Sequence, residues 1–397
     1  MVRTAPPARP SSAPVTPQHV GAAVVGLGAL GSAALWRLAA RGHDVVGFEQ
    51  FGIGHALGSS HGQTRLFREA CLEHPGLAPM AAESRDLFRQ LEEAAGRDLL
   101  RITGGYLVGA AGSDVVAGTA RAADAHALPY ERLDRKELAR RLPQFAELAA
   151  DAEALFDPRC GVIDPEATVV SAVAEAARLG ARVHPQTRVE TLQAGPAGVR
   201  ITAGGQDYLA EKAILAAGAW LPPFVPDLDL VPIRTPLHWF APAAGAGSGF
   251  EVEHFPVVVH QTDPATVLWG HGSVDGGLVK LGLGDIWGER PPRIDPSALD
   301  RGVNTSEWRR LSALVGRVLP GLDPVPARVE PCMITLSPDH QFVVGPSPAS
   351  PRILVAGGDN GHAFKHCLAL GEILARDVTG EAHPYDLGFV RPSRFSV

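Results

Sequence analysis

The chain has 397 residues, of which 45% are hydrophobic and 20% charged, and its formal net charge is −7. A negatively charged chain of ordinary composition is not expected to bind nucleic acid or an anionic membrane surface as its main partner. No apolar run approaches the roughly 20 residues that a membrane-spanning helix needs. The length suits two domains or one large composite domain.

Two further features concern processing and cell compartment. Residues 1–19 are rich in Pro, Ala and Ser and lack a continuous apolar segment, so we expect a disordered leader rather than a signal peptide. The four cysteines are far apart and form no CxxC pair; they are Cys71, Cys160, Cys332 and Cys367. This spacing favours reduced thiols in a cytoplasmic protein and speaks against a metal site.

The first elements after the leader predict a strand, a helix and a second strand. The apolar run 22–25 predicts a buried parallel strand. Residues 32–41 are rich in Ala and Leu and predict a helix, which Gly42 ends. Residues 44–48 form a second apolar run. The order of these elements is that of a βαβ unit.

A glycine motif and an acidic residue give this unit a candidate function. The motif Gly26-Leu-Gly28-Ala-Leu-Gly31 lies between the first strand and the helix, and Glu49 follows the second strand. Glycines at this spacing let the backbone approach a pyrophosphate at the helix N-terminus, and Glu49 can accept a hydrogen bond from a ribose hydroxyl. An acidic residue at position 49 favours FAD or NAD over NADP.

The loop after the second strand gathers polar side chains. It runs to Arg68 and carries His61, Thr64 and Arg65 among glycines. A loop that leaves the second strand of such a unit runs along the carboxyl edge of the sheet, where ligands bind. We therefore expect these side chains to serve the nucleotide site rather than to form a solvated loop.

The middle of the chain predicts short elements of both kinds. Helices are predicted at 76–96, 114–125, 135–142, 165–179 and 305–318, and strand regions at 100–109 and 154–162. Antiparallel strands are predicted at 187–192 and 199–202, continuing through 208–217. The small residues that follow, in Ala217-Gly-Ala-Trp220, can let a strand pass under a nucleotide.

A proline-rich crossover at 222–236 is the candidate domain boundary. After it, alternating runs predict an antiparallel sheet from the segments 238–242, 257–260, 267–271 and 278–283. We expect a nucleotide-binding domain and a substrate domain. The first comprises residues 20–75, 150–222 and 325–397, and the second comprises residues 76–149 and 223–324.

The C-terminal segment returns to the nucleotide pattern. Strands are predicted at 342–345 and 353–356, and Gly357-Gly-Asp-Asn-Gly361 leads into a helix predicted at 362–378. Such a turn can offer free N–H groups and a positive helix end to the edge of a reduced flavin. From these residues alone, a plain turn between strand and helix is an equal alternative.

Lysine is rare in this chain, which otherwise uses arginine, and codon bias explains the rarity itself. The four lysines are Lys136, Lys212, Lys280 and Lys365. The last two lie among Gly, Leu, Phe and His, where a solvated surface lysine is not expected. A compact ammonium group differs from a guanidinium in what it can bind, so these two are candidate functional cations.

Several segments together resemble the monomeric sarcosine oxidase and N-methyltryptophan oxidase family of FAD-dependent amine oxidoreductases. They follow in family order across nearly the whole chain after the leader: Gly26–Gly31 with Glu49, Gly58-Ser-Ser-His-Gly-Gln-Thr-Arg-Leu-Phe-Arg68, Ala217-Gly-Ala-Trp220, Leu278-Val-Lys-Leu-Gly282, Cys332-Met-Ile-Thr-Leu-Ser-Pro-Asp339 and Gly361-His-Ala-Phe-Lys365. The resemblance implies an α/β fold with a Rossmann-like FAD domain of the glutathione-reductase type. It also implies a second, mainly antiparallel α+β substrate domain.

The resemblance assigns chemistry to individual residues. Arg68 and Lys365 match the pair that holds a substrate carboxylate, and two such cations suit a buried carboxylate. Lys280 matches the lysine that activates oxygen beside flavin N5. Cys332 matches the cysteine whose sulfur is bonded to the flavin 8α-methyl group. Two alternatives stay open from the residues alone: a structural ion pair for the cations and a small buried cysteine for Cys332.

The resemblance also implies the cofactor contacts. His61 and Arg65 match residues that pack against the flavin ring, and Arg65 can stabilise its anionic reduced form. The implied cofactor-binding set is Gly26, Gly28, Gly31, Glu49, His61, Thr64, Arg65, Val189, Gly218, Trp220, Cys332, Gly358, Gly361, His362 and Lys365.

The chain departs from the family pattern in the floor of the pocket. Gly284 stands where sarcosine-type members have a histidine, and Ile334 replaces an aromatic hydroxyl. Trp269-Gly270-His271 replaces a Tyr-Gly-Phe segment. Trp269 and His271 therefore join the candidate catalytic residues, with His271 as either a core residue or a proton acceptor. Sarcosine itself becomes a doubtful substrate.

Together these features predict an FAD-dependent oxidase of a secondary amine, an N-methyl or cyclic amino acid. The imine formed would hydrolyse, and O2 would be reduced to H2O2. The alternatives are a dehydrogenase of the same fold that uses another acceptor, and a flavin-bearing subunit without turnover. We expect a monomer that acts on a small substrate with a carboxylate and needs no metal.

Overall fold

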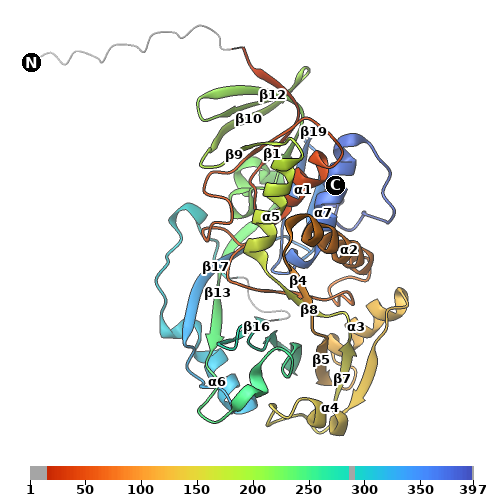
Figure 1. Cartoon of the computed structure of the whole chain (residues 1–397), viewed down its shortest axis with the longest axis vertical. Coiled ribbons are helices and arrows are strands. Elements are labelled where there is room, and N and C mark those ends of the chain that lie inside the picture. Colours follow the sequence, from red (N-terminus) through yellow and green to blue (C-terminus); the bar gives the residue numbers. More distant parts are fainter. Residues whose placement is uncertain (1–15, 286–290, 396–397) are drawn as a thin grey trace, which may run out of the picture.

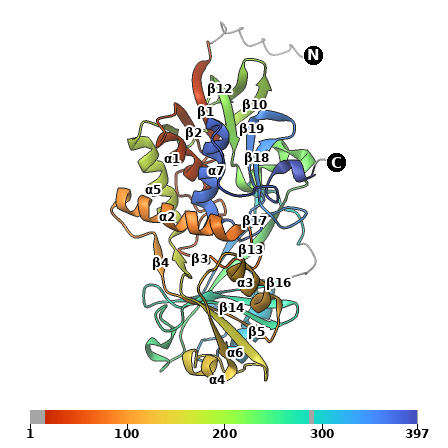
Figure 2. The same cartoon turned by 90° about the vertical axis from the view of Figure 1, so that its right-hand side faces the viewer.

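The computed structural model describes residues 16–285 and 291–395. Figures 1 and 2 show an elongated molecule in which one sheet with its helices lies above a second sheet. The expected leader falls largely outside the described residues. The two sheets confirm the predicted α/β class with a second, mainly antiparallel sheet.

The first sheet is built on five parallel strands in the order β9-β2-β1-β12-β19. Their bounds are Arg182–His184, Val45–Phe48, Gln18–Val25, Gln206–Leu215 and Ser350–Gly357. The predicted apolar runs form the buried parts of β1 and β2 because both faces of this sheet are covered. Antiparallel strands extend the sheet: β10 (Val189–Gly195) and β11 (Gly198–Ala203) beside β12, and β18 (Val343–Ser347) beside β19.

Four helices pack in the core of this half: α1 (Ala29–Ala39), α2 (Leu77–Ala95), α5 (Pro165–Arg178) and α7 (Cys367–Thr379). α1 and α7 cross closely because a Cβ on Gly371 would lie 2.6 Å from the backbone of Ala33. α1 begins earlier than predicted, directly after Gly28. α7 begins later than predicted because a 3₁₀ turn, Phe364–His366, precedes it.

Glu372 of α7 joins this helix to α1. Its carboxylate accepts from Arg37 at 2.7 Å and from Arg41 at 2.5 Å. Burial disfavours the charged form of Glu372, but the two arginines outweigh it and lower its pKa to about 2. Because this folded pKa lies below the unfolded value of about 4.3, the stabilisation is complete above that pH and is lost as the pH falls towards 2.

We expect Glu372→Gln to lower the free energy of unfolding by about 3 kcal/mol at neutral pH. The difference from the unchanged protein should shrink between about pH 4 and pH 2, as measured by denaturant titration. A difference that stays constant down to the acid end of this range would contradict this account of the ion pair.

The second sheet has the strand order β17-β13-β16-β15-β14-β5-β7-β6. The bounds are Arg328–Leu336, Val231–Phe240, Val279–Asp285, Thr266–His271, Val257–Asp263, Gly105–Ala110, Ala152–Asp157 and Glu131–Asp134. All neighbours are antiparallel except β14 and β5. Three helices accompany it: α3 (Asp114–Ala125), α4 (Arg135–Arg141) and α6 (Arg309–Val318).

β13 begins inside the proline-rich stretch that was predicted as a crossover. Pro232 and Pro236 pair with β17 and lie outside His238–Phe240, the part of β13 that pairs with β16. On that side the described residues form only an isolated bridge, between Ile233 and Arg293. Proline lacks an N–H group and is tolerated where one side of a strand has no neighbour. The prolines therefore hid the first half of this strand from sequence reasoning.

A small antiparallel sheet joins loop segments between the halves. It contains β3 (Arg65–Phe67), β8 (Gly161–Ile163) and β4 (Leu100–Ile102). No described helix is both long and apolar enough to cross a membrane. Within residues 16–285 and 291–395, no three His, Cys, Asp or Glu side chains are grouped so that they could hold a metal ion.

Candidate active site

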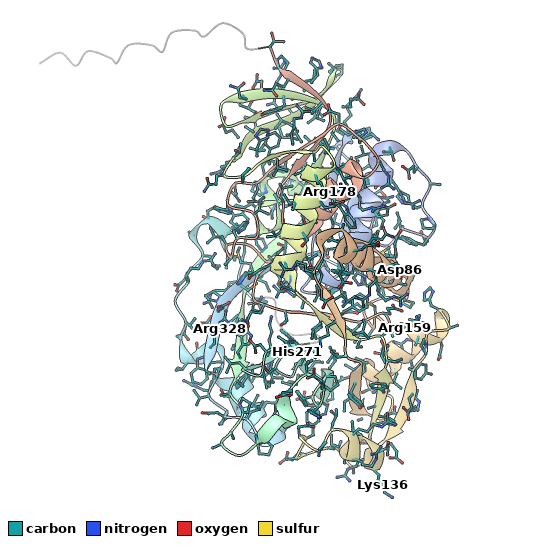
Figure 3. All side chains as sticks on the ribbon, in the orientation of Figure 1. Asp86, Lys136, Arg159, Arg178, His271 and Arg328 are labelled. Atoms are coloured by element: carbon teal, nitrogen blue, oxygen red, sulfur yellow. The ribbon has the colours of Figure 1, made fainter. Side chains whose placement is uncertain are left out.

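A cavity of about 1480 Å³ runs from the glycine motif into the region between the two sheets. Its lining includes Glu49 at one end and Lys280 and Lys365 at the other. Figure 3 shows His271, another lining residue, at the level where the two halves of the molecule meet. The fold thus assembles one elongated cavity from distant parts of the chain.

Most of the predicted site residues line this cavity. They are Gly26, Gly28, Glu49, Thr64, Arg65, Arg68, Val189, Gly218, Trp220, Trp269, His271, Lys280, Cys332, Gly361, His362 and Lys365. The other three, Gly31, His61 and Gly358, are not part of its lining.

The glycines of the motif have different surroundings. Gly26 has φ +87°, and a Cβ there would lie 2.6 Å from the carbonyl oxygen of Ala216. A Cβ on Gly31 would overlap the carbonyl oxygen of Gly26. For Gly28 the nearest atom would be Ser60 Oγ at 3.4 Å. Gly26 and Gly31 therefore permit close backbone packing, whereas a Cβ at Gly28, which lines the cavity, would make only an ordinary contact with Ser60 Oγ.

These surroundings predict that alanine at Gly31 mainly lowers stability, whereas alanine at Gly28 mainly weakens cofactor binding. Gly31→Ala should lower the free energy of unfolding by about 3 kcal/mol because the overlap forces the turn and helix apart. Gly28→Ala should change stability by less than about 1 kcal/mol but weaken FAD binding about tenfold or more. Thermal unfolding and flavin fluorescence measure the two quantities. Gly52→Ala, at a position with open space, is the control, and equal effects of all three would contradict the assignment.

Glu49 is held in a defined position by the motif itself. Its carboxylate accepts from the N–H of Leu27 at 2.9 Å and from the N–H of Phe51 at 2.9 Å. Burial disfavours the charged form, but the hydrogen bonds from His55, Leu27 and Phe51 outweigh it and lower the pKa of Glu49. Phe51 and His55 both lie against Oε1, so it is Oε2 that keeps a lone pair able to accept from a ribose hydroxyl.

Lys280 and Arg65 form a buried pair of cations beside Cys332. Lys280 Nζ donates to the carbonyl oxygens of Gly62 at 2.8 Å and Thr64 at 2.7 Å. Arg65 donates to the carbonyl oxygens of Thr64 and Ser59 at 2.8 and 2.7 Å. Burial and the neighbouring Arg65 lower the pKa of Lys280 well below its usual range. Lys280 is therefore held by two carbonyl oxygens in a buried setting that makes its proton easier to release than that of an ordinary lysine.

Arg68 and Lys365 meet at one carboxylate, that of Glu73. Arg68 Nη2 lies 2.6 Å from Glu73 Oε1, and Lys365 Nζ lies 3.2 Å from the same oxygen. Burial disfavours the charged form of Glu73, but Arg68 and Lys365 outweigh it and hold its pKa well below the usual range. Glu73 Oε2 and Arg68 Nη1 are buried without hydrogen-bond partners among the described residues.

This contact bears directly on the predicted carboxylate site. The structure brings the two cations together, as the sequence predicts, and the alternative of an ion pair with an acid is also realised through Glu73. The two interpretations are compatible because a substrate carboxylate can exchange with an internal one. The sequence reasoning missed Glu73, although an acid five residues after Arg68 was a visible signal.

Trp269 reshapes the floor of the cavity. It faces Gly282 across β15 and β16, and its indole lies where a side chain on Gly282 would stand. The same ring approaches the Cβ position of Gly284 to 3.8 Å. Trp269 therefore lies against Gly284, the glycine at the position of the family histidine. The two departures from the family pattern occupy the same part of the cavity.

His271 is a buried, hydrogen-bonded residue next to this floor. Its Nε2 lies 2.8 Å from Thr64 Oγ1 and its Nδ1 lies 2.6 Å from the carbonyl oxygen of Gly272. Burial lowers the pKa of His271 to about 4, so the imidazole is neutral at physiological pH. Both nitrogens are engaged, and His271 is thus held in one orientation.

Cys332 lies in β17 and faces the cavity from a nearly closed apolar setting with Leu237 and Trp239. Its thiol is 3% exposed, and burial raises its pKa. The setting suits a small buried cysteine and a sulfur positioned against a ligand alike.

The turn before α7 differs from the prediction of free N–H groups. The N–H of Gly361 donates to Asp359 Oδ1 at 2.9 Å, and the N–H of His362 donates to the Asp359 carbonyl at 2.9 Å. The helix itself begins only at Cys367. The N–H groups of Gly361 and His362 are therefore engaged within the turn, which at these two residues favours the alternative of a plain turn between strand and helix.

Three further predicted residues have defined protein contacts. His61 Nδ1 lies 3.9 Å from a Glu330 oxygen, and burial lowers the pKa of His61 to about 4. His362 Nε2 approaches the carbonyl oxygen of His340 at 3.2 Å. Trp220 Nε1 donates to Ser297 Oγ at 2.9 Å.

The cavity also has lining residues that sequence reasoning did not identify. At the nucleotide half they come from the segment 291–297, and at the Lys365 end from α3. The α3 residues are Asp114, Val115 and Arg121. No local motif marks either segment, since both reach the cavity only through the packing of distant elements.

Comparison with known proteins agrees with this architecture. Residues 22–376 match the family model described as DAO, FAD dependent oxidoreductase. The chain is 35% identical to monomeric sarcosine oxidase of Streptomyces avermitilis, over 94% of this chain and 97% of the relative. It is 27% identical to N-methyl-L-tryptophan oxidase of Yersinia pestis, over 94% and 98%.

Among solved structures, NikD, an unusual amino acid oxidase essential for nikkomycin biosynthesis, superposes with a TM-score of 0.79 at 26% identity. The match covers 94% of this chain and 98% of NikD. The matches in sequence and in fold both extend over nearly the whole chain. The chain therefore belongs to the FAD dependent oxidoreductase family, among the relatives of monomeric sarcosine oxidase.

Proposed function

We propose that the protein is an FAD-dependent oxidase of a secondary amine, an N-methyl or cyclic amino acid. The amine is oxidised to an imine, which hydrolyses in water, while O2 is reduced to H2O2. The observation that carries this proposal is the meeting of Arg68 and Lys365 on one carboxylate oxygen in the cavity that also contains Lys280.

The residues present suit FAD. A Cβ on Gly28, at the start of α1, would meet only Ser60 Oγ, at 3.4 Å. Glu49 Oε2 keeps a free lone pair, and Val189, Gly218 and Trp220 line the same cavity. Bound there, FAD supplies the two-electron redox chemistry. Cys332, which faces the cavity, is the residue we propose as its covalent attachment.

The chain's own residues orient the substrate and manage charge. Arg68 and Lys365 hold the carboxylate, which fixes the amine at one point of the cavity. Trp269, with Val259 and Leu283, gives the cavity an apolar wall. This wall favours a substrate with a ring or an apolar side chain over sarcosine. Lys280 presents positive charge where O2 is reduced.

Glu73 should act as an internal competitor of the substrate carboxylate. Glu73→Gln removes the buried anion and leaves two cations to be neutralised by a ligand. We expect a non-oxidisable carboxylate ligand to bind about tenfold more tightly to this variant at neutral pH, measured by titration of the flavin absorbance. Glu93→Gln, on the exposed face of α2, is a control. Unchanged or weaker binding in Glu73→Gln would contradict the exchange.

The proposed function is tested by an anaerobic screen of N-methylated and cyclic amino acids. A substrate should bleach the flavin absorbance, and readmission of air should restore it with one H2O2 per amine oxidised. Bleaching without peroxide would indicate a dehydrogenase with another acceptor. Absence of bleaching by every amine would indicate a subunit without turnover. Flavin that stays with denatured, precipitated protein would support attachment through Cys332, and Cys332→Ala should abolish it.

We also make proposals about the oligomeric state, the cell compartment and the domain division. We propose a monomer, in keeping with the monomeric relative, and a cytoplasmic location, in keeping with four buried free cysteines. We also propose the two-domain division, with β7 and β17 assigned to the substrate domain because both strands belong to the second sheet.

A further inference from the structure

The segment that cradles Lys280 is an unusual turn. The N–H of Thr64 donates to the carbonyl oxygen of Gly62 at 2.7 Å, and Gln63 between them has φ +65°. A three-residue turn of this kind with positive φ at a residue other than glycine is strained and persists only where its surroundings hold it. The contacts of residues 62–64 therefore indicate which function requires this strained backbone.

The turn aims two carbonyl groups at one ammonium. Lys280 Nζ donates to the carbonyl oxygens of Gly62 and Thr64 at 2.8 and 2.7 Å. In an extended strand the carbonyl groups of residues i and i+2 point to the same side but lie about 6.6 Å apart, too far for both to bind one ammonium group. The N–H of Gly62 is in turn fixed by Glu166 Oε1 at 3.0 Å. One end of the turn is thus held by Glu166.

The other end is held by His271. A carbonyl oxygen can only accept, so His271 Nδ1 carries the proton and donates to Gly272. The neutral imidazole then presents Nε2 as an acceptor, to which the Thr64 hydroxyl donates at 2.8 Å. His271 and Lys280 are also paired directly across β15 and β16. The neighbouring strands β15 and β16 therefore supply His271 and Lys280, the two side chains that bind Thr64.

We propose that His271 is a positioning residue for Lys280. By accepting from the Thr64 hydroxyl, it fixes the strained turn whose two carbonyls orient the Lys280 ammonium. The proposal rests on the proposed role of Lys280 in the reaction with oxygen. It assigns His271 neither a contact with substrate nor a proton transfer, and it resolves the choice left open between a core residue and a proton acceptor.

The test compares variants of the flavin-loaded protein. His271→Phe keeps the ring but removes the acceptor, whereas His271→Gln keeps an acceptor, and Thr64→Val removes the donor. We expect His271→Phe and Thr64→Val each to slow reoxidation of the reduced flavin by O2 about tenfold. The double variant should be no slower than either single variant, because both remove the same bond. His271→Gln should recover most of the rate.

Two readouts separate positioning from general loosening of the fold. In the intact protein, the ¹⁵N shifts of His271 should show the Nδ1–H form without titration between pH 5 and pH 9, and Thr64→Val should move the Nε2 signal. The pH dependence of reoxidation should shift in His271→Phe. The charged or titratable groups around Lys280 that stay constant in this comparison are His61, Arg65, Arg328, Glu330 and, where it is not bonded to the flavin, Cys332.

A pair of variants at Gln63 approaches the same turn through the backbone. Valine strongly disfavours positive φ and glycine accepts it, so Gln63→Val should slow reoxidation more than Gln63→Gly. Additive effects of His271→Phe and Thr64→Val, or an equal effect on flavin reduction, would overturn the positioning role. If Lys280→Met leaves reoxidation unchanged, the role of Lys280 itself fails. If only Lys280→Met slows reoxidation, the failure is confined to His271.

Discussion

Lys280→Met is expected to slow the reaction of the reduced protein with O2 by about a hundredfold or more. Anaerobic reduction of the flavin by substrate should change by no more than about a factor of three. Oxygen gains negative charge as it is reduced, and an ammonium group already fixed by two carbonyls stabilises that charge without reorganisation. Methionine preserves the length and apolar character of the side chain but not the charge.

Stopped-flow absorbance measures the two half-reactions separately. Lys136→Met, on the exposed surface of α4 (Figure 3), is a matched control that should leave both rates unchanged. A variant at position 280 in which both half-reactions slow equally would assign Lys280 to the general architecture of the cavity instead.

The second large effect concerns the carboxylate site. Arg68→Met and Lys365→Met should each lower kcat/KM about 10- to 100-fold for an amino acid substrate, since each removes a charged hydrogen bond of about 1.5–3 kcal/mol. Each also leaves Glu73 with one cation instead of two. Combining either change with Glu73→Gln should therefore recover stability.

The matching comparison uses a substrate analogue that lacks the carboxylate. Its reduction of the flavin should be slow in every variant and nearly independent of positions 68 and 365. Steady-state kinetics with the substrate and with the analogue give the ratio of their kcat/KM values. If the ratio of the two kcat/KM values stays the same in the unchanged protein and the variants, these cations do not recognise the substrate carboxylate.

Local sequence predicted the parts of the fold whose physics is local. The helix predicted at 114–125 is α3 with the same bounds, because its helical spacing and the glycine, serine and histidine around it lie within one segment. The glycine motif, its strand and Glu49 were predictable for the same reason. A tight turn leaves a fixed spacing in the sequence.

The features that were missed depend on contacts between distant segments. Prolines disguised the start of β13, and only its pairing with β17 shows why they are tolerated there. Glu73 was visible as a residue, but nothing near it in sequence places Lys365 within 3.2 Å. Asp359 accepts from the N–H of Gly361 in the turn before α7 through side-chain geometry that a glycine pattern does not encode.

The indole of Trp269, which lies over Gly282 and Gly284, affects how the substrate preference of this protein can be changed. A smaller residue at position 269 alone would leave a void above Gly282 and Gly284. A Cβ added at Gly282 would collide with the indole, whereas one added at Gly284 would only come into ordinary contact with it. Single exchanges on either strand are therefore expected to fail where a simultaneous exchange succeeds. Evolution towards a different substrate would therefore require two substitutions together, one at Trp269 and one at a glycine that faces it.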